Sequence, residues 1–493
     1  MKKIYNSKIC FLLLILFITS ACDDYLDVES ETAVSSESVF QSQDGVLFAL
    51  TGVYTRLKLK GFYGTEFALI GDAATDNGKI PSDRESAGAN ADRMPFAYTL
   101  NLNTTNTSTL WQDAYIVINN INNILENIDN ATDINEDVRS QVIAEGRILR
   151  AWAYFSLVQL YSQDFNFTAD QSHPGVPIVI ATGIEDQPVR NTVGEVFNFI
   201  FTEMNESISV LQNNDAIGRD NDIYFLNYFS AVAMRAKMHF YVTNYAEALA
   251  DADIVISQGP YSLVENYTTS LYEARGLGDL EFIDAWAGTV IVESESIFQL
   301  YVNEDNPEEV TTNRSIIDIY TSNNGNAAHA ISNDLLSLYE AGDVRTNWYK
   351  IEDVDPHVFK YPGGFGDARD DTPYSVLRLT EFILMKAECE VRVNNADNVA
   401  RDLVNLITLR AGASPIASSG NALIEDIITE RRKEMAFEGN RLFDLKRLQR
   451  GFTRVDCILP ENCTVVYPSN LYAWPIPQDE LNGNPNIRQN DGY

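Results

Sequence analysis

Apolar residues that recur at steps of three and four constrain this chain more than any other feature. One series runs from Trp111 through Tyr115 and Ile118 to Ile128, with Asn and Glu between the apolar positions. That spacing places the apolar side chains on one face of an α-helix. Similar series predict further helices over residues 142–161, 193–211, 226–241 and 246–257. The pattern therefore indicates a predominantly helical fold.

Two neighbouring predicted helices have the character of a repeat. Small residues such as Ala233 and Ala236 lie on the first helix, and Ala248 and Ala252 lie on the second. Small residues let two helices pack closely, as in a tetratricopeptide unit. A second pair is predicted over residues 377–391 and 396–409. Stacked pairs bury a continuous core, so we predict a mostly α fold in which tetratricopeptide-like helix pairs form a curved scaffold with an irregular insertion lobe.

The remaining segments divide the chain. Residues 60–110 have little periodicity and are rich in Gly, Asp, Asn and Thr. Long loops on a rigid scaffold commonly carry binding function. The predicted parts are a signal peptide (1–21), a mainly helical scaffold (22–260 and 376–450), an irregular lobe (261–375) and a loop-rich C-terminal segment (451–493).

The N-terminus has the pattern of a bacterial lipoprotein. Lysines precede the apolar run of residues 9–18, and Thr19, Ser20 and Ala21 lead to Cys22. This is the order of a secretory signal, and the run is too short to span a hydrocarbon core of about 30 Å. A lipid on Cys22 would hold the mature protein at a membrane face. The alternative is a plain secretory peptide with an incidental Cys, and lipoboxes usually carry Leu where Thr19 stands.

Charge limits the partners of the chain. The formal net charge is −34. So acidic a surface disfavours nucleic acid and anionic lipid headgroups, and it leads us to expect a neutral ligand rather than a polyanion. Solubility in a salty medium is the alternative explanation of the charge.

Three cysteines follow Cys22. Cys389 lies inside an apolar helical run, which indicates a buried small hydrophobic residue. Cys457 and Cys463 bracket a turn-rich loop, and a disulfide between them fits an oxidising compartment. A metal ion would need more ligands than this loop offers.

The sequence contains no recognised catalytic or cofactor signature. There is no GxSxG, GxxxxGK[ST], HExxH or dinucleotide glycine fingerprint, so we expect no catalytic residue, no metal site and no cofactor. Aromatic residues are plentiful, with 24 Tyr, 24 Phe and 5 Trp. Apolar sugar faces stack on flat rings while nearby polar groups bond the hydroxyls.

Most aromatic residues are expected to fill the helical core. Those in the irregular stretches, with polar neighbours, are the ones predicted to contact a ligand. They are Tyr63, Phe67, Asp72, Asp76, Asn77, Arg84, Phe96, Tyr98, Tyr272, Phe282 and Trp286.

Several segments together resemble one family. Residues 377–388 read LRLTEFILMKAE and residues 430–447 read ERRKEMAFEGNRLFDLKR, while WPIPQDE and QNDGY stand at 474–480 and 489–493. Near the N-terminus, residues 22–27 read CDDYLD and directly follow the predicted signal peptide. In this order they resemble the SusD/RagB-like outer-membrane nutrient-binding lipoproteins of Bacteroidetes, and the resemblance covers the whole mature chain.

The resemblance implies a binding protein without catalytic residues. Such proteins are lipid-anchored at the cell surface, where they act as lids over a SusC-like TonB-dependent transporter and help capture oligosaccharides or polysaccharides for import. Some relatives serve peptides, so the same lid role for peptides or another nutrient is the alternative. A lipoprotein glycoside hydrolase and a purely structural repeat scaffold are further alternatives. The family's ligand sites lie in variable loops, so its motifs assign no contact residue here.

The most recognisable motif is predicted to be structural. Within a predicted helix over 430–447, Glu438 with Arg441 and Asp444 with Arg447 are spaced i,i+3, which suits ion pairing. We interpret this segment as a clamp that closes the helical array rather than as an active site.

Overall fold

Helices make up most of the described residues of this computed structural model, and the strands are few and short. This confirms the predicted mostly α fold. None of the described helices is long and apolar enough to cross a membrane. The structure describes residues 39–64, 66–79, 105–183, 187–219, 222–264, 294–300, 330–352, 355–358, 360, 374–456 and 463–493.

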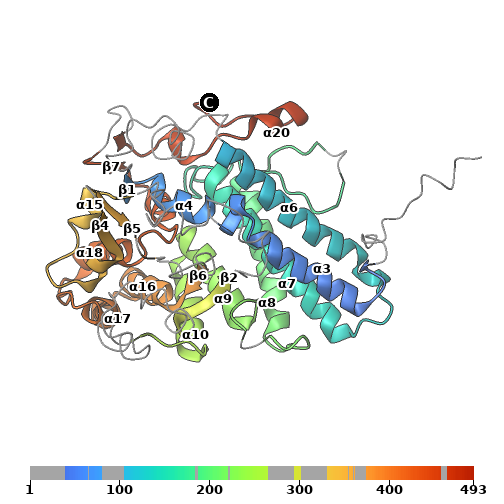
Figure 1. The fold of residues 1–493 in the computed structure, drawn as a ribbon, viewed down its shortest axis with the longest axis horizontal. Helices are drawn as coiled ribbons and strands as arrows, with labels where there is room; N and C mark the ends of the chain where they lie inside the picture. Colours follow the sequence, from blue (N-terminus) through green and yellow to red (C-terminus); the bar gives the residue numbers. More distant parts are fainter. Residues whose placement is uncertain are drawn as a thin grey trace, which may run out of the picture.

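Long helices from the first half of the chain lie side by side (Figure 1). Their N-termini carry the expected caps: Ser42 before α3, Asn135 before α7, and Thr192 in a capping box with Glu195 before α8. The apolar face predicted from Trp111 onward is buried in α6. The helices are α3 (Gln43–Leu57), α6 (Thr105–Asn127), α7 (Glu136–Tyr161) and α8 (Val193–Leu211).

The predicted repeat pair forms two packed helices, α9 (Tyr228–Tyr241) and α10 (Tyr245–Gln258). The alanines that were expected at their crossing, including Ala233 and Ala252, are fully buried. Their relation to a tetratricopeptide unit stays a prediction.

The C-terminal helices form a second layer beside α10 (Figure 1). Leu384, Val404 and Ile427 belong to an apolar cluster of their own, separate from the main core. The elements are α16 (Leu379–Cys389), η6 (Glu390–Asn394), α17 (Asp397–Arg410), α18 (Gly420–Glu434) and α19 (Arg441–Arg447).

The strands form small antiparallel sheets. One has the order β1-β3-β5-β4, and the others pair β2 with β6 and β7 with β8. The bounds are β1 (Gly78–Lys79), β2 (Ser296–Leu300), β3 (Ala330–Ile331), β4 (Tyr349–Glu352), β5 (Asp355–Val358), β6 (Tyr374–Arg378), β7 (Phe452–Thr453) and β8 (Thr464–Val465). The short helices are η1 (Lys60–Gly64), α4 (Glu66–Ala73), η4 (Ile128–Asn130), α15 (Asn333–Leu336), η5 (Val344–Trp348), η8 (Asn470–Tyr472) and α20 (Gln478–Gly483).

Three predictions about local structure were wrong. The segment 430–447 is not one helix, because α18 ends at Glu434 and α19 begins at Arg441. Between them, Phe437 and Gly439 have φ of 63° and 78°, which lie outside the helical region. Residues 60–110 are not wholly irregular, since they contain η1, α4 and the start of α6. The helix predicted from residue 377 begins at Leu379, after β6.

The C-terminal end of α7 is completed by distant parts of the chain. A helix leaves its last carbonyl groups without partners inside the helix. Here the carbonyl groups of residues 159–162 accept hydrogen bonds from Lys446 Nζ, the Trp474 N–H, the Arg190 guanidinium and the Asn490 side chain. The longest described helix is therefore fixed at one end by the C-terminal segment.

Candidate functional site

Five of the residues that were predicted to contact a ligand are described by the structure, and all five lie in one segment around α4. They are buried, with exposed fractions between 0% for Asp72 and 7% for Phe67. Each has a partner inside the protein. This placement favours a structural role for the whole segment. The described members are Tyr63, Phe67, Asp72, Asp76 and Asn77.

The two aromatic members belong to the core. The Tyr63 ring stacks on Trp152 with centroids 5.9 Å apart, and its hydroxyl lies 2.9 Å from the Ser156 hydroxyl. The Phe67 ring stacks on Phe443 of α19 at 5.3 Å. Neither ring offers a free face on the surface for a sugar.

The three polar members bind the clamp, residues 430–447. Asp76 accepts two hydrogen bonds of 2.9 Å from the Arg441 guanidinium, and the Asn77 side-chain oxygen accepts one of 2.8 Å from Arg432. Asp72 accepts from the Asn77 amide at 2.6 Å and from the Gly439 N–H at 2.7 Å. Burial raises the pKa of Asp72 to about 6, although these hydrogen bonds oppose the shift.

The other predicted contacts lie outside the described residues, and their role stays a prediction. They are Arg84, Phe96, Tyr98, Tyr272, Phe282 and Trp286. Cys22 and Cys457 also lie outside them. Cys463 is disulfide-bonded, and Cys389 is a buried free thiol as expected.

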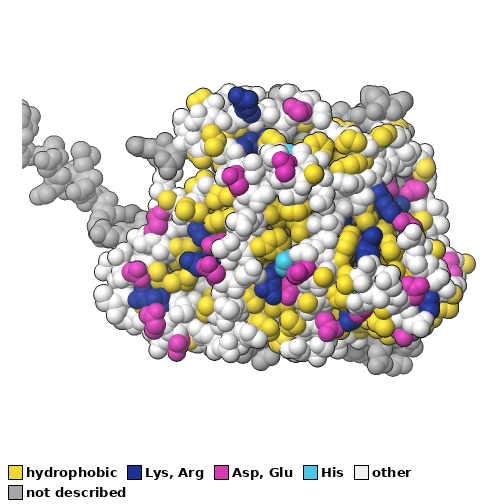
Figure 2. Space-filling model, turned by 180° about the vertical axis from the view of Figure 1, so that it is seen from behind, with side chains coloured by type: hydrophobic (Ala, Val, Ile, Leu, Met, Phe, Trp, Pro, Cys, Tyr) yellow, Lys and Arg dark blue, Asp and Glu magenta, His cyan; other side chains and the backbone are white. Residues whose placement is uncertain are grey.

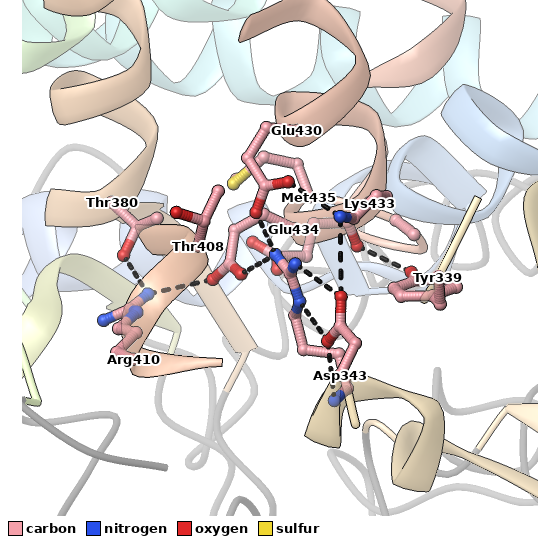
Figure 3. A network of polar contacts seen from close by, with 12 residues as sticks. Tyr339, Asp343, Thr380, Thr408, Arg410, Glu430, Lys433, Glu434 and Met435 are labelled. Atoms are coloured by element: carbon pink, nitrogen blue, oxygen red, sulfur yellow. Dashed lines mark hydrogen bonds and ion pairs between the residues drawn. The ribbon is translucent and has the colours of Figure 1, made fainter. Parts of the chain in front are cut away.

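The clamp is the most heavily charged buried region that the structure describes. Glu434 is fully buried and pairs with three guanidiniums, those of Arg345 at 3.0 Å, Arg378 at 3.1 Å and Arg410 at 2.9 Å. Figure 3 shows Glu434 between Arg410 on one side and the group around Asp343 on the other. Burial opposes ionisation of Glu434, but the guanidiniums outweigh it and hold its pKa well below its usual range.

A second group of buried ions joins α18, α19 and α16. Arg431 bonds Glu381 and Asp444 at 2.9 Å each, and Arg447 bonds Glu388 at 2.8 Å. Asp444 also pairs with Arg447 at 2.7 Å, which confirms one predicted i,i+3 ion pair.

The other predicted i,i+3 pair, Glu438 with Arg441, was wrong. The turn between α18 and α19 rotates the two side chains apart. Glu438 bonds Arg378 and Lys360 at 2.7 and 2.5 Å, and Arg441 bonds Asp76 instead. The motif was correctly interpreted as charged and interlocking, but its partners come from distant segments.

This arrangement is suited to holding segments together and not to catalysis. The carboxylates of the clamp are buried and already paired with cations, so they have no free position for a substrate. Among the described residues no group of three or more His, Cys, Asp or Glu side chains is placed to hold a metal ion. Sequence reasoning missed Arg345 and Arg410 as members of the network, because they stand alone in sequence and only the fold brings them to Glu434.

Two family models match the chain. The model of a family described as "Starch-binding associating with outer membrane" matches residues 24–240. The model of the SusD family matches residues 354–493. Together they cover more than half of the chain from its two ends.

Relatives and solved structures agree with these matches along nearly the full length. The chain is 25% identical to the SusD-like protein P25 of Formosa agariphila over 97% of both chains. It resembles a solved SusD superfamily protein of Bacteroides vulgatus with a TM-score of 0.79 at 22% identity, covering 92% of this chain and 99% of that one. A solved putative sugar binding protein of the same species has a TM-score of 0.76 at 23% identity, covering 92% and 99%.

Proposed function

Because this chain belongs to the SusD-like family, we propose that it captures oligosaccharides or polysaccharides at the cell surface without cleaving them. It passes them to a SusC-like TonB-dependent transporter beneath it. The observation that carries the proposal is the match of residues 24–240 to a family described as starch-binding and associated with the outer membrane. The full-length similarity to a putative sugar binding protein supports the same ligand class.

The distribution of charge supports a role in binding rather than in hydrolysis. Glycoside hydrolases place two carboxyl groups on either side of the scissile bond, where the substrate reaches both. Conspicuous carboxylates, such as Glu434 in the clamp and Glu388 on α16, are instead fully buried and bonded to arginines. They stabilise the scaffold and leave ligand recognition to other surfaces.

A lipid on Cys22 is the proposed anchor. Replacing Cys22 with Ala should release the protein from the outer-membrane fraction into the soluble fraction, because a single sequence position carries all the acyl chains. Equal membrane retention of the wild type and Cys22→Ala would contradict the anchor.

Binding is tested by native affinity electrophoresis in gels that contain one polymer each. We expect retardation by at least one neutral polysaccharide of a panel that includes starch, pullulan, laminarin and barley β-glucan, and less by alginate or pectin, because the chain carries a net charge of −34. Reducing ends should not increase during incubation with the bound polymer. A protein that ignores every polymer but binds a peptide mixture would replace the proposal with the peptide alternative.

The partnership with the transporter needs a separate experiment. An affinity tag on this protein should co-purify a TonB-dependent transporter from detergent-solubilised outer membranes. Purification with no such partner, under conditions that preserve other outer-membrane complexes, would overturn the delivery step and leave glycan binding intact.

A further inference from the structure

An aromatic surface lies on the helical scaffold, outside the segments that were predicted to contact ligand. It combines the loop after α7 with the middle of α8, the C-terminal end of α9 and the turn that follows α9. Figure 2 shows the face of the molecule opposite to that of Figure 1, where hydrophobic, acidic and basic side chains all lie near histidine. We name it the 166–244 surface, and its members are Asn166, Phe167, Phe201, His239, Thr243 and Asn244.

Ring contacts, hydrogen bonds and neighbouring positions in the chain connect these residues. The Phe167 ring contacts His173 at 5.4 Å, and the Asn244 N–H donates to the His239 carbonyl at 2.8 Å. The Phe201 and His239 rings stack with centroids 4.4 Å apart and an interplanar angle of 16°. The Asn166 amide donates to the Thr243 hydroxyl at 3.0 Å, which joins the loop to the turn after α9. Phe167, next to Asn166, exposes 42% of its surface.

The loop that carries Phe167 is fixed rather than loose. The Phe167 N–H donates to the Asp164 carbonyl at 3.0 Å. The Asp164 carboxylate is buried and accepts from the Asn166 N–H at 3.1 Å and the Tyr467 hydroxyl at 2.6 Å. Because these hydrogen bonds hold the loop in place, the exposed phenylalanine loses little conformational freedom when a ligand stacks on its ring.

The turn after α9 carries backbone strain. Thr243 has φ of 61°, which is unusual for a β-branched residue and strains the backbone. Such residues gather at ligand-binding positions when the surrounding structure holds them. Here the strained position orients the hydroxyl that accepts from Asn166.

The polar groups of this surface are neutral. Asn166, Thr243 and Asn244 supply amides and a hydroxyl, and burial lowers the pKa of His239, which favours its uncharged ring. Arg235 of α9 is paired with Asp251 at 2.7 Å, and these two groups and the Glu247 carboxylate are the charges that act on His239. Flat rings beside neutral donors and acceptors match a sugar with an apolar ring face and uncharged hydroxyls.

We propose that the 166–244 surface is a second contact site for neutral glycan on the helical scaffold, in addition to the ligand site of the proposed function. The proposal rests on the proposed function, because it assumes that the captured ligand is a carbohydrate. A polysaccharide chain is long enough to touch both regions. A second contact raises the overall affinity through the high effective concentration of a tethered ligand.

Exposed phenylalanines provide a matched pair of variants. Phe167→Ala and His239→Ala remove rings from the surface, whereas Phe48→Ala removes a ring that is 75% exposed on α3, away from it. Circular dichroism and urea unfolding establish that each variant is folded. Phe167→Trp restores a stacking ring and serves as the rescue.

The test is affinity electrophoresis of the full chain in the neutral polymers named above, with alginate as the charged comparison. We expect Phe167→Ala and His239→Ala each to weaken binding by about 3- to 10-fold, the size of one aromatic stacking contact, while Phe48→Ala and Phe167→Trp bind as the wild type does. Equal binding by all variants would overturn the second site but not the proposed function. A wild type that binds no polymer would overturn both.

Two other outcomes would also refute this site. Loss of alginate binding in Phe167→Ala, with neutral binding unchanged, would show that the surface serves a charged ligand. Loss of transporter co-purification without any loss of glycan binding would make it a protein interface.

Discussion

The α9–α10 pair and the clamp at residues 430–447 are both buried, but they are held together in different ways. Alanines such as Ala233 and Ala252 are fully buried in the packed pair, in which one ion pair, Arg235 with Asp251, joins the two described helices. The clamp instead buries charged side chains such as Glu434 and Arg431. Buried ions are stable only while their partners remain, whereas close packing is sensitive to added volume. The two regions should therefore respond to opposite kinds of substitution.

The largest effect is expected for Glu434→Gln in the clamp. The change keeps the volume but removes the negative charge that faces Arg345, Arg378 and Arg410. The free energy of unfolding should fall by about 3–5 kcal/mol, as in other broken buried ion groups. Urea unfolding followed by circular dichroism measures it. A loss as small as that of a surface pair would show that the clamp is not held by its charges.

Gly71→Ala tests whether the clamp also depends on backbone packing. A Cβ at Gly71 in α4 would lie 2.0 Å from the Gly439 carbonyl oxygen, so we expect a loss of about 2–3 kcal/mol despite the better helix propensity of Ala. Gly52 in α3 is the control, because a Cβ there meets nothing within 4 Å. Gly52→Ala should stabilise by about 0.5–1 kcal/mol. The same sign for both variants would contradict the close approach.

Ala252→Leu tests the α9–α10 pair in the same assay. Ala252 is fully buried, and added methylene groups in a packed interior cost about 1–3 kcal/mol. Ala246 lies on the same helix and is exposed, so Ala246→Leu should change the free energy of unfolding by less than about 0.5 kcal/mol. If both variants changed the free energy of unfolding by the same small amount, the interior around Ala252 would have room for a larger side chain, which would contradict close packing.

Lys446 should make the stability of the clamp depend on pH above 7. Burial lowers the pKa of Lys446 to about 7 in the folded protein, although the negative charge of Asp164 opposes the shift. In the unfolded chain the pKa of a lysine is about 10.4. Between these values the unfolded chain binds more protons, so the free energy of unfolding rises with pH, by at most about 1.4 kcal/mol per unit. We expect this slope between pH 7 and 10 in the wild type and a flatter one in Lys446→Met. Parallel slopes would contradict it.

The smallest effect is expected for a surface ion pair. Glu425 and Arg450 lie 2.5 Å apart but are 54% and 40% exposed. Exposed pairs contribute about 0–1 kcal/mol, so Glu425→Gln should change the free energy of unfolding within that range and less in high salt. A loss comparable to that of Glu434→Gln would remove the distinction between buried and exposed charge.

The same contrast explains which elements could be predicted from sequence. Apolar periodicity located α8 and α9 closely, because a helix that packs through one apolar face repeats that face in its sequence. It failed between Glu434 and Arg441, where both flanking helices are rich in charge and buried polar contacts decide the chain path. Periodicity contains no information about a turn that distant ion pairs hold in place.

The candidate site was less predictable than the fold. Composition marked residues 60–110 as an irregular stretch with polar and aromatic side chains, but could not show that Asp76 would face Arg441, more than 350 residues later. The aromatic residues of the 166–244 surface carried no distinguishing signal, because Phe201 and His239 become neighbours only when α8 and α9 pack. In both cases the missing information was the pairing of segments distant in sequence.

The completed end of α7 has a consequence for how the protein is made. The Tyr161 carbonyl oxygen accepts from Arg190, 29 residues later, and from Asn490, 329 residues further along the chain. At about 5–20 residues per second, a ribosome needs roughly 15 to 70 seconds to synthesise that interval. Until then the longest described helix has an unfinished end, so the emerging chain cannot complete its native structure.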